Sequence, residues 1–378
     1  LSGIEEIDPA MATMTVRAGT PLEAVQKAAE EAGFLVPLDL GARGSCAIGG
    51  NLATNAGGTQ VLRYGNAREL CLGLEVVTPQ GELWDGLSGL RKDNTGYDLR
   101  DLFVGSEGTL GVITAATLRL VPQPAATMTA LAACASIDDA VRLLERARRR
   151  LDAGLTGFEV MNRFSLELVA RHFPQLPRPF GADALPAWTV LLELSDAESE
   201  GHAREAFEAL LADALDAGTI ADAVVAESVA QSKALWHLRE AIPLAQAEEG
   251  LNIKHDIALP VSAIPGFVAS TDAALQAAFP GVRLVDFGHL GDGNLHYNVQ
   301  APVGTDAAAF LREREHAVNA IVYDAVCARG GSISAEHGIG QLKRDELARR
   351  KPAVALRMMR AIKAALDPRG IMNPGRVV

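Results

Sequence analysis

GARGSCAIGGNLATNAGG, residues 41–58, is the stretch that decides the fold of this 378-residue chain. Its glycines carry no side chains, so their backbone N–H groups are open to a ligand, and successive open N–H groups form a nest that binds an anion. Asn51, Thr54 and Asn55 add short side chains that can hydrogen-bond to the same ligand. The stretch therefore predicts a loop that binds a pyrophosphate.

Two common nucleotide-binding folds are excluded by the spacing of the glycines. A Rossmann fold needs GxGxxG between a strand and a helix, and a P-loop NTPase needs GxxxxGK followed by Ser or Thr. Neither Gly44–Gly50 nor GSEGTLG, residues 105–111, has the first spacing, and the second pattern does not occur in the sequence. The phosphate-binding loop therefore belongs to a different fold.

The composition indicates a globular protein of two or three domains that binds neither nucleic acid nor an anionic membrane. The chain is 48% hydrophobic and carries a net charge of −12, whereas those partners need clustered Lys and Arg. Its cysteines form no CxxC pair, so we expect a reducing, cytoplasmic setting without disulfides or a thiolate zinc site. We also expect no membrane-spanning helix and no signal peptide, because no run of about 18 apolar residues occurs.

The order of expected elements indicates an α+β protein. The first ~120 residues are glycine-rich, and PQPA (122–125) predicts a domain boundary after them. Before the boundary, the patterns predict a strand at 13–19, a helix at 21–33, a hairpin at 72–83 and a strand pair at 108–122. After it, they predict helices at 136–154, 198–218, 306–329 and 352–366, and strands at 187–195, 255–262 and 283–299.

Four long motifs resemble the FAD-linked oxidases with the vanillyl-alcohol-oxidase-type fold. They are PLDLGARGSCAIGGNLATNAGG (37–58), LRYG (62–65), NTGYDLRDLFVGSEGTLGVIT (94–114) and MNPGRVV (372–378). The resemblance implies a PCMH-type FAD-binding domain at 1–124 and an α+β substrate and metal domain with an antiparallel sheet at 125–345. A C-terminal helix and tail at 346–378 would return to the flavin. Family members begin with a further glycine-rich βα segment, so we expect the FAD-binding domain here to lack its first part.

The same resemblance implies which residues contact FAD. Two glycine-rich stretches wrap the cofactor in that family, and an asparagine of the C-terminal tail approaches the flavin. Carried onto this sequence, the contacts are Gly49, Gly50, Asn51, Thr54, Asn55, Gly58, Gly105, Glu107, Gly108, Thr109, Gly111, Ile113 and Asn373.

A second signal, VDFGHLGDGNLHYNV (285–299), predicts a pair of histidines on a hairpin. Gly291–Asn294 is a strong turn signal, and a reversal there places His289 directly opposite His296. Opposed residues have Cβ atoms roughly 4.5–5.5 Å apart, so the two imidazoles can share a metal ion. Glu336, which lies between small residues and glycines, offers a third ligand. A site of two histidines and a glutamate suits a catalytic divalent metal, with zinc first and manganese or iron as alternatives.

GHLGDGNLH (288–296) followed by AEHGIG (335–340) is similar to the D-2-hydroxyglutarate, D-lactate and glycolate dehydrogenases. The resemblance implies that His289, His296 and Glu336 hold the metal, that His337 is the general base and that Asn298 helps to hold the substrate. Arg239 offers a bidentate fork and Lys254 a point charge for carboxylates, and both lie where the hydroxyglutarate branch binds them. A hydroxyl residue four positions after that arginine is replaced here by Pro243.

The expected function is therefore FAD-dependent, metal-assisted oxidation of a D-2-hydroxy acid to the 2-oxo acid, with D-2-hydroxyglutarate favoured. D-lactate, or glycolate as the substrate of one subunit of a complex, is the alternative within the fold. An alkyl-transfer flavoenzyme and a metallohydrolase with a vestigial flavin domain are the rivals outside this reaction. The electron acceptor could be a quinone, an electron-transfer flavoprotein or another carrier, and the resemblance favours a homodimer.

Overall fold

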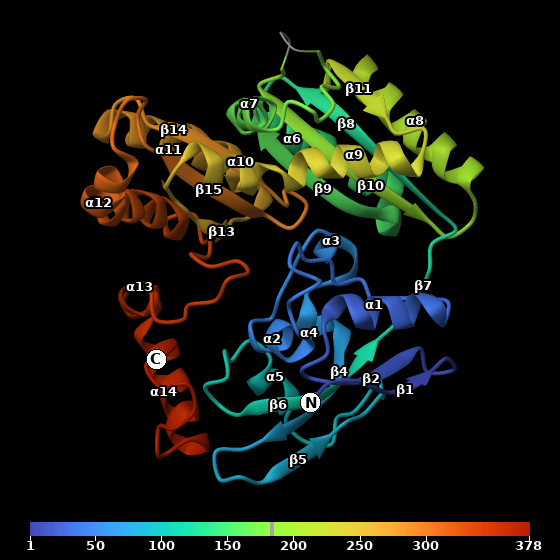
Figure 1. The fold of residues 1–378 in the computed structure, drawn as a ribbon, viewed down its shortest axis with the longest axis vertical. Coiled ribbons are helices and arrows are strands. Elements are labelled where there is room, and N and C mark those ends of the chain that lie inside the picture. Colours follow the sequence, from blue (N-terminus) through green and yellow to red (C-terminus); the bar gives the residue numbers. More distant parts are fainter. Residues whose placement is uncertain (182–184) are drawn as a thin grey trace. The chain divides into compact units, whose positions relative to one another are not determined.

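The computed structural model describes residues 1–181 and 185–378 (Figure 1). These residues form two compact units. Unit 1 joins Leu1–Gln123 to Glu336–Val378, and unit 2 is Pro124–Ala335.

Unit 1 is built on an antiparallel sheet in the order β1-β2-β6-β4-β5. Its strands are β1 (Ile4–Asp8), β2 (Thr13–Arg17), β4 (Cys71–Val77), β5 (Leu83–Gly86) and β6 (Val112–Arg119), with β3 (Phe34–Leu35) paired to β7 (Val121–Pro122) beside it. Its helices in the N-terminal segment are α1 (Leu22–Glu31), α2 (Ile48–Ala53), α3 (Val61–Tyr64), α4 (Ala67–Leu70) and α5 (Arg100–Phe103).

Most of the elements expected in this segment are confirmed. Strand β2, helix α1 and the β4–β5 hairpin lie where the sequence predicts them. The strand pair predicted at 108–122 is wrong, because β6 pairs with β2 and β4 while β7 pairs with β3. Only Leu120 separates the two strands, and one residue is too short a loop to reverse the chain into a hairpin.

Helix α1 shows why this segment folds onto the sheet. Leu22, Val25 and Ala29 recur at helical spacing and are fully buried. They join Met14 and Val16 of β2 in one core. These two strand residues alternate with more exposed neighbours, as a sheet with one covered face requires.

The C-terminal segment completes unit 1. It contains α13 (Arg344–Arg350) and α14 (Ala353–Leu366), and Ile362 and Leu366 of α14 pack against the core of the unit. The Lys363 ammonium donates to the carbonyls of Thr109 (2.7 Å) and Met372 (2.9 Å). Residues 336–378 are thus held to the N-terminal segment by both apolar and polar contacts.

Unit 2 contains a second antiparallel sheet in the order β11-β8-β10-β9-β14-β15-β12, with β13 also paired to β15. Its strands are β8 (Ala126–Cys134), β9 (Leu155–Asn162), β10 (Trp188–Asp196), β11 (Asp222–Val225), β12 (Asn252–Ile253), β13 (Asp256–Ala258), β14 (Arg283–Gly288) and β15 (Asn294–Gln300). Its helices are α6 (Ile137–Leu151), α7 (Arg163–His172), α8 (Glu200–Asp216), α9 (Val229–Glu240), α10 (Ile242–Glu249), α11 (Ile264–Ala278) and α12 (Ala307–Cys327).

Helices α7, α9 and α10 cover one face of this sheet, and Figure 1 shows α9 and α10 crossing in front of its strands. The core beneath them includes Leu131 of β8, Met161 of β9 and Leu191 of β10, with Leu235 and Leu238 of α9 packed on top. These three strands carry the side chains that α9 reaches. The face under α9 is therefore the part of unit 2 that matters for the site described below.

Helix α6 follows its sequence signals closely. The Ser136 side chain accepts from the backbone N–H of Asp139 and so caps the start of the helix predicted at 136–154. Acidic residues in its first turn and arginines in its last turn complement the helix dipole.

A buried carboxyl on β14 has no partner to stabilise its charge. Asp286 is 2% exposed, and neither of its side-chain oxygens has a hydrogen-bond partner among the described residues. Opposite it on β15 lies Tyr297, whose hydroxyl donates to Asp272 (2.6 Å). Burial raises the pKa of Asp286 well above its ordinary value, and the negative charge of Asp272 adds to the rise. Asp286 is therefore protonated in the fold at a pH where it is ionised in the unfolded chain.

We expect Asp286→Val to raise the free energy of unfolding by about 1–3 kcal/mol at neutral pH, because it removes an unsatisfied buried polar group. A pKa raised by folding destabilises the fold as pH rises from the unfolded pKa through the folded one. The gain should therefore shrink as pH falls toward about 4. Thermal unfolding across this range, with the exposed Asp222→Val on edge strand β11 as control, checks the prediction. A gain that is the same at every pH, or a loss at neutral pH, would contradict it.

Candidate functional site

The β14–β15 hairpin brings the two predicted histidines together. The imidazole centroids of His289 and His296 are 5.8 Å apart, with ring planes at 77°. The predicted register is wrong, however, because His296 lies opposite Phe287 and His289 belongs to the loop between the strands. The backbone N–H groups of Gly293 and Asn294 both donate to the His289 carbonyl, so the chain already turns at His289.

Gly288 permits this tight reversal where β14 ends. Its φ is +154°, and a Cβ there would lie 2.5 Å from the carbonyl oxygen of Asn294. On the other side of the loop, the Asn294 amide donates to Asp256 (3.0 Å) and to the Ile257 carbonyl (2.9 Å), which fixes the start of β15 against β13. Both ends of the loop between β14 and β15 are therefore fixed, and this fixes the backbone next to His289 and His296.

Glu159 of β9 lies beneath this loop and connects two of the predicted site residues. One of its carboxylate oxygens is 2.6 Å from Nδ1 of His289, and the other accepts from Nε of Arg239 (2.8 Å). Glu159 is fully buried. Burial by itself would raise the pKa of Glu159, but the charges of His289 and Arg239 and the hydrogen bonds from both outweigh it and lower the pKa to about 2. The carboxylate is therefore ionised and acts as an acceptor for both neighbours.

Arg239 lies on α9 with its guanidinium over the ring of Phe287, 4.7 Å from the ring centroid. Only 7% of the residue is exposed. Its Nε is used by Glu159, while in the described part of the chain neither terminal nitrogen donates a hydrogen bond. Lys254 is exposed between β12 and β13, and within the described residues it forms neither an ion pair nor a hydrogen bond. Arg239 and Lys254 can therefore both still receive an anionic ligand.

Asn298 lies on the same face of β15 as His296, two residues further on. Its amide is already engaged, since Nδ2 donates to Gln246 of α10 (2.9 Å) and Oδ1 accepts from the backbone of His255 (3.1 Å). Asn298 is 4% exposed. In this arrangement it supports the sheet and α10, and it would contact a substrate only through a change in these bonds. Pro243 lies in the first turn of α10, where it donates no hydrogen bond.

Glu336 and His337 begin the C-terminal segment of unit 1. Within that unit, the Glu336 carboxylate accepts from the backbone N–H of Gly58 (2.8 Å), while His337 is exposed. Their chain neighbour Ala335 ends unit 2, and its N–H donates to the carbonyl of Asp256 (3.3 Å), which lies opposite His296 in the β13–β15 pairing. Ala335, the last residue of unit 2, is therefore held against the strand that pairs with the strand carrying His296.

The two glycine-rich stretches of unit 1 lie side by side. The backbone N–H groups of Gly105 and Glu107 donate to the carbonyls of Leu52 (2.9 Å) and Ala53 (2.8 Å) in α2. The C-terminal tail joins them, because the Asn373 amide donates to the Glu107 carbonyl (2.6 Å). Among the predicted FAD residues, Asn55, Glu107 and Asn373 have φ of +52°, +54° and +41°. Such backbone conformations are uncommon for residues other than glycine and cluster at functional sites.

The expected nest of open N–H groups is wrong in part, because residues 48–53 form helix α2 and two of the glycine N–H groups have acceptors within the protein. Gly49 N–H donates to Ala18, and Gly58 N–H donates to Glu336. Helix formation wins because each N–H that bonds inside the protein avoids an unsatisfied donor. Two features of α2 remain available to a ligand. Asn51 is 5% exposed with an amide nitrogen that has no partner among the described residues, and a Cβ at Gly50 would meet no atom within 4 Å.

Two of the remaining predicted FAD residues, Gly111 and Ile113, pack against other residues of unit 1. A Cβ at Gly111 would lie 2.8 Å from Val76 and 2.9 Å from Phe103, so this glycine permits close packing. Ile113 is buried in β6 opposite Val76. The others, Thr54, Gly108 and Thr109, lie at the end of α2 or in the loop before β6.

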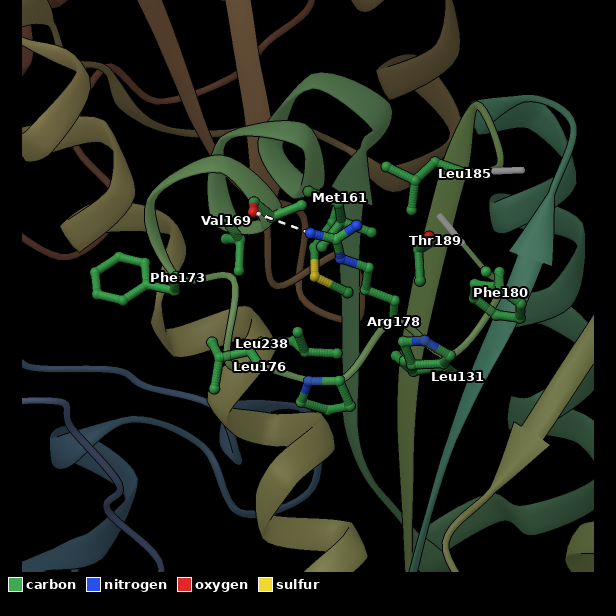
Figure 2. A pocket seen from close by; sticks show the side chains of 15 residues that line it. Leu131, Met161, Val169, Phe173, Leu176, Arg178, Phe180, Leu185, Thr189 and Leu238 are labelled. Atoms are coloured by element: carbon green, nitrogen blue, oxygen red, sulfur yellow. Dashed lines mark hydrogen bonds between the residues drawn. The ribbon is translucent and has the colours of Figure 1, made fainter. Parts of the chain in front are cut away.

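An apolar cavity of unit 2 lies under α7 and the loop that follows it (Figure 2). Its volume is about 40 Å³, and Leu131, Met161, Val169 and Phe173 are among its lining residues. Figure 2 shows Arg178 donating to the Ala170 carbonyl (3.4 Å) at its edge. A small cavity with this apolar lining does not suit a dicarboxylate.

The sequence did not predict Glu159. The signal that could have found it is the single acidic residue in the otherwise uncharged strand LTGFEVMN, because a charge within a fully buried strand needs a specific partner. That partner cannot be read from spacing, since His289 lies 130 residues away.

Two family models match the chain. Residues 123–377 match the C-terminal domain of FAD linked oxidases, and residues 1–86 match an FAD binding domain. The described residues include no helix with the length and apolar character needed to cross a membrane.

Curated relatives match over nearly the whole chain. The D-2-hydroxyglutarate dehydrogenase of Xanthomonas citri pv. viticola is 43% identical over 97% of this chain and 75% of its own length. The mitochondrial D-2-hydroxyglutarate dehydrogenase of Bos taurus is 41% identical over 97% of this chain and 65% of its own length. That of Stutzerimonas stutzeri is 38% identical over 97% and 77%. The chain thus spans about two thirds to three quarters of the length of these relatives.

Solved structures share the fold at low sequence identity. p-Cresol methylhydroxylase with substrate bound superposes with a TM-score of 0.75 at 16% identity, covering 100% of this chain and 78% of that one. Alkyldihydroxyacetonephosphate synthase gives 0.71 at 16% identity, covering 99% and 66%. With the sheets and helices of both units, this likeness confirms the expected α+β class and PCMH-type fold.

Proposed function

This chain belongs to the FAD linked oxidase family, and from that premise we propose that it oxidises a D-2-hydroxy acid to the 2-oxo acid with FAD, with D-2-hydroxyglutarate as the preferred substrate. The observation that carries the proposal is the group on one face of unit 2, where His289 lies beside His296 and Arg239 is held nearby through Glu159. Imidazoles suit a metal, and a guanidinium suits a carboxylate. The choice of D-2-hydroxyglutarate is supported by the relatives that carry the name D-2-hydroxyglutarate dehydrogenase.

FAD is proposed to bind unit 1 at the two glycine-rich stretches and the tail. The residues fit the cofactor in two respects. The Asn51 amide is a buried donor without a partner in the described part of the chain, and the missing side chain of Gly50 opens onto free space. When bound, FAD supplies the hydride acceptor, while the protein supplies orientation and charge. The contacts proposed at the other FAD residues follow the family resemblance.

We further propose that His289, His296 and Glu336 hold a divalent metal, with zinc first and manganese or iron as alternatives. The donor set fits, because two neutral imidazoles and one carboxylate are ordinary ligands of these ions. The Nδ1 contact of His289 with Glu159 also fits, since metal-bound histidines commonly donate their second ring N–H to a carboxylate. A bound metal there supplies Lewis acidity that lowers the pKa of a substrate hydroxyl.

The roles proposed for the remaining residues follow from their charge. Arg239 offers its two terminal nitrogens, and Lys254 its ammonium, to substrate carboxylates. His337 accepts the α-hydroxyl proton as general base, the role that imidazole fills most often in enzymes. Asn298 contributes by fixing α10 against β15 and contacts substrate if its bond to Gln246 opens.

D-lactate and glycolate are the alternative substrates. The observation that favours them is Pro243, which leaves α10 without the hydroxyl that accompanies this arginine in the hydroxyglutarate branch. For the intact protein we propose an electron carrier such as a quinone or an electron-transfer flavoprotein as acceptor, a homodimer, and a reducing, cytoplasmic compartment.

Anaerobic reduction of the flavin tests the substrate assignment. The full-length, FAD-loaded protein is mixed with the D and L forms of 2-hydroxyglutarate and lactate, and with glycolate, while the visible flavin band is followed. We expect D-2-hydroxyglutarate to bleach the flavin fastest, and its L form to leave it oxidised. Faster bleaching by D-lactate or glycolate would move the assignment to that substrate. No bleaching by any of these acids would overturn the proposed reaction.

A further inference from the structure

We infer that Glu159 is the positioning residue of the site, because its single buried carboxylate sets both the ring of His289 and the guanidinium of Arg239. The inference rests on the proposed function, in which these two residues bind metal and substrate. It goes beyond that function by assigning a role to a residue outside both groups of ligands. Each step below uses contacts within unit 2.

The first step is the cost of placing this charge in the core. Glu159 has no exposed surface, and an isolated carboxylate buried in a protein is strongly destabilising. Both of its oxygens are used, one by His289 (2.6 Å) and one by Arg239 (2.8 Å). The charge is therefore tolerated only while both partners are in place, which ties the positions of the partners to each other.

The second step concerns the imidazole. Nδ1 of His289 lies 2.6 Å from one Glu159 carboxyl oxygen, which places the ring in hydrogen-bond reach of this acceptor. A ring that donates its Nδ1–H to Glu159 keeps the lone pair of Nε2 for a metal. A lone pair fixed on one nitrogen and a ring fixed in orientation are what a metal ligand requires.

The third step concerns the guanidinium. Glu159 holds Arg239 at Nε, and the ring of Phe287 supports the guanidinium plane at 4.7 Å. Holding Nε and the plane leaves the two terminal nitrogens as a fork with a defined direction. Glu159 therefore couples metal binding to carboxylate recognition, since moving its side chain would disturb His289 and Arg239 together.

The matched control is another buried acid on the neighbouring strand. Glu193 of β10 is 8% exposed, and its carboxylate accepts from Trp236 Nε1 (2.8 Å) and from the Thr156 hydroxyl (3.1 Å). It therefore resembles Glu159 in burial and in making a polar contact with α9, and these two hydrogen bonds go to residues other than His289 and Arg239. If removing any buried charge weakened zinc binding, a variant at Glu193 should show the same loss as a variant at Glu159.

The test measures zinc affinity by competition with a chromophoric chelator, which needs no turnover. An amide at position 159 can accept from only one partner through its oxygen, so Glu159→Gln should weaken zinc binding by about 10- to 100-fold. Glu159→Asp is too short to reach both partners and should also weaken it. Glu193→Gln should bind zinc within about twofold of wild type, even if its thermal stability falls. The Michaelis constant for D-2-hydroxyglutarate should rise in both Glu159 variants.

Wild-type zinc affinity in folded Glu159→Gln or Glu159→Asp would overturn the inference, as would an equal loss in Glu193→Gln. If Glu159→Gln does not fold, Glu159→Asp decides the question by the same measurement. A wild type that binds no zinc would overturn both the inference and the proposed metal site. A wild type that binds zinc without reducing its flavin with hydroxy acids would overturn only the proposed reaction, and the loss of affinity in the Glu159 variants would still support the inference.

Discussion

His289→Ala and His296→Ala are each expected to lower kcat/KM for D-2-hydroxyglutarate by on the order of 10³-fold while FAD stays bound. A Lewis acid contributes several kcal/mol to such a step, and each 1.4 kcal/mol changes a rate tenfold. The two rings lie 5.8 Å apart on the β14–β15 hairpin, so removing either leaves the metal with too few ligands. The FAD contacts proposed above lie in unit 1, so the flavin content should not change. Steady-state kinetics, bound zinc and the flavin spectrum measure the three quantities.

His202→Ala is the control for the loss of an imidazole from unit 2. His202 is a residue of α8 whose Nδ1 is 2.7 Å from the Asp196 carboxylate, and it has no place in the proposed site. Its removal should leave both kcat/KM and bound zinc within about twofold of wild type. Full activity in His289→Ala or His296→Ala would refute the metal role, and loss of FAD from either would show that these residues serve the fold instead.

Arg239→Met is expected to discriminate between substrates. A hydrogen bond to a charged group contributes about 1.5–3 kcal/mol, so the KM for D-2-hydroxyglutarate should rise roughly 10- to 100-fold if Arg239 binds the distal carboxylate. D-lactate has no distal carboxylate, and its KM should change only a few-fold. Steady-state kinetics with both substrates on the same preparation give the ratio of the two effects.

The ratio is the informative quantity because Arg239→Met also leaves one oxygen of Glu159 without its partner. That loss disturbs the site for every substrate alike, so it cancels when two substrates are compared. Lys254→Met is a useful companion, since Lys254 is exposed and its removal leaves no buried charge unpaired. Equal effects of Arg239→Met on both substrates would argue against a clamp on the distal carboxylate.

Local signals in the sequence predicted the hairpin and its histidines, but not their register. Glycines and an Asp–Gly pair mark a reversal near 291–294, and the structure has one there. The sequence does not reveal that the His289 carbonyl accepts from the N–H groups of Asp292, Gly293 and Asn294, which lengthens the loop and moves His296 opposite Phe287. Register depends on such loop hydrogen bonds and on the contacts of Asn294 with β13, and neither has a pattern in the sequence.

Contacts between distant parts of the chain account for what was missed. Glu159 meets Arg239 across 80 residues and His289 across 130, so spacing could not bring them together. Residues 41–58 show a different kind of error, in which a local pattern predicted a backbone geometry that distant contacts override. Their composition fits an open anion nest, yet residues 48–53 form α2 because the Gly49 and Ile48 N–H groups find acceptors at Ala18 and Thr20. Family motifs indicated the cofactor correctly where local chemistry alone suggested a different geometry for the loop.

The most direct measurement is single-turnover reduction of the flavin with and without metal. Full-length protein carrying FAD and zinc is mixed anaerobically with D-2-hydroxyglutarate, then the experiment is repeated after removing zinc with a chelator and after adding zinc back. We predict complete reduction of the flavin by the zinc-loaded protein, at least 10²-fold slower reduction after chelation, on the order expected for losing a Lewis acid, and recovery with zinc. An unchanged rate in protein shown to be free of zinc, or no reduction in the loaded protein, would contradict the account.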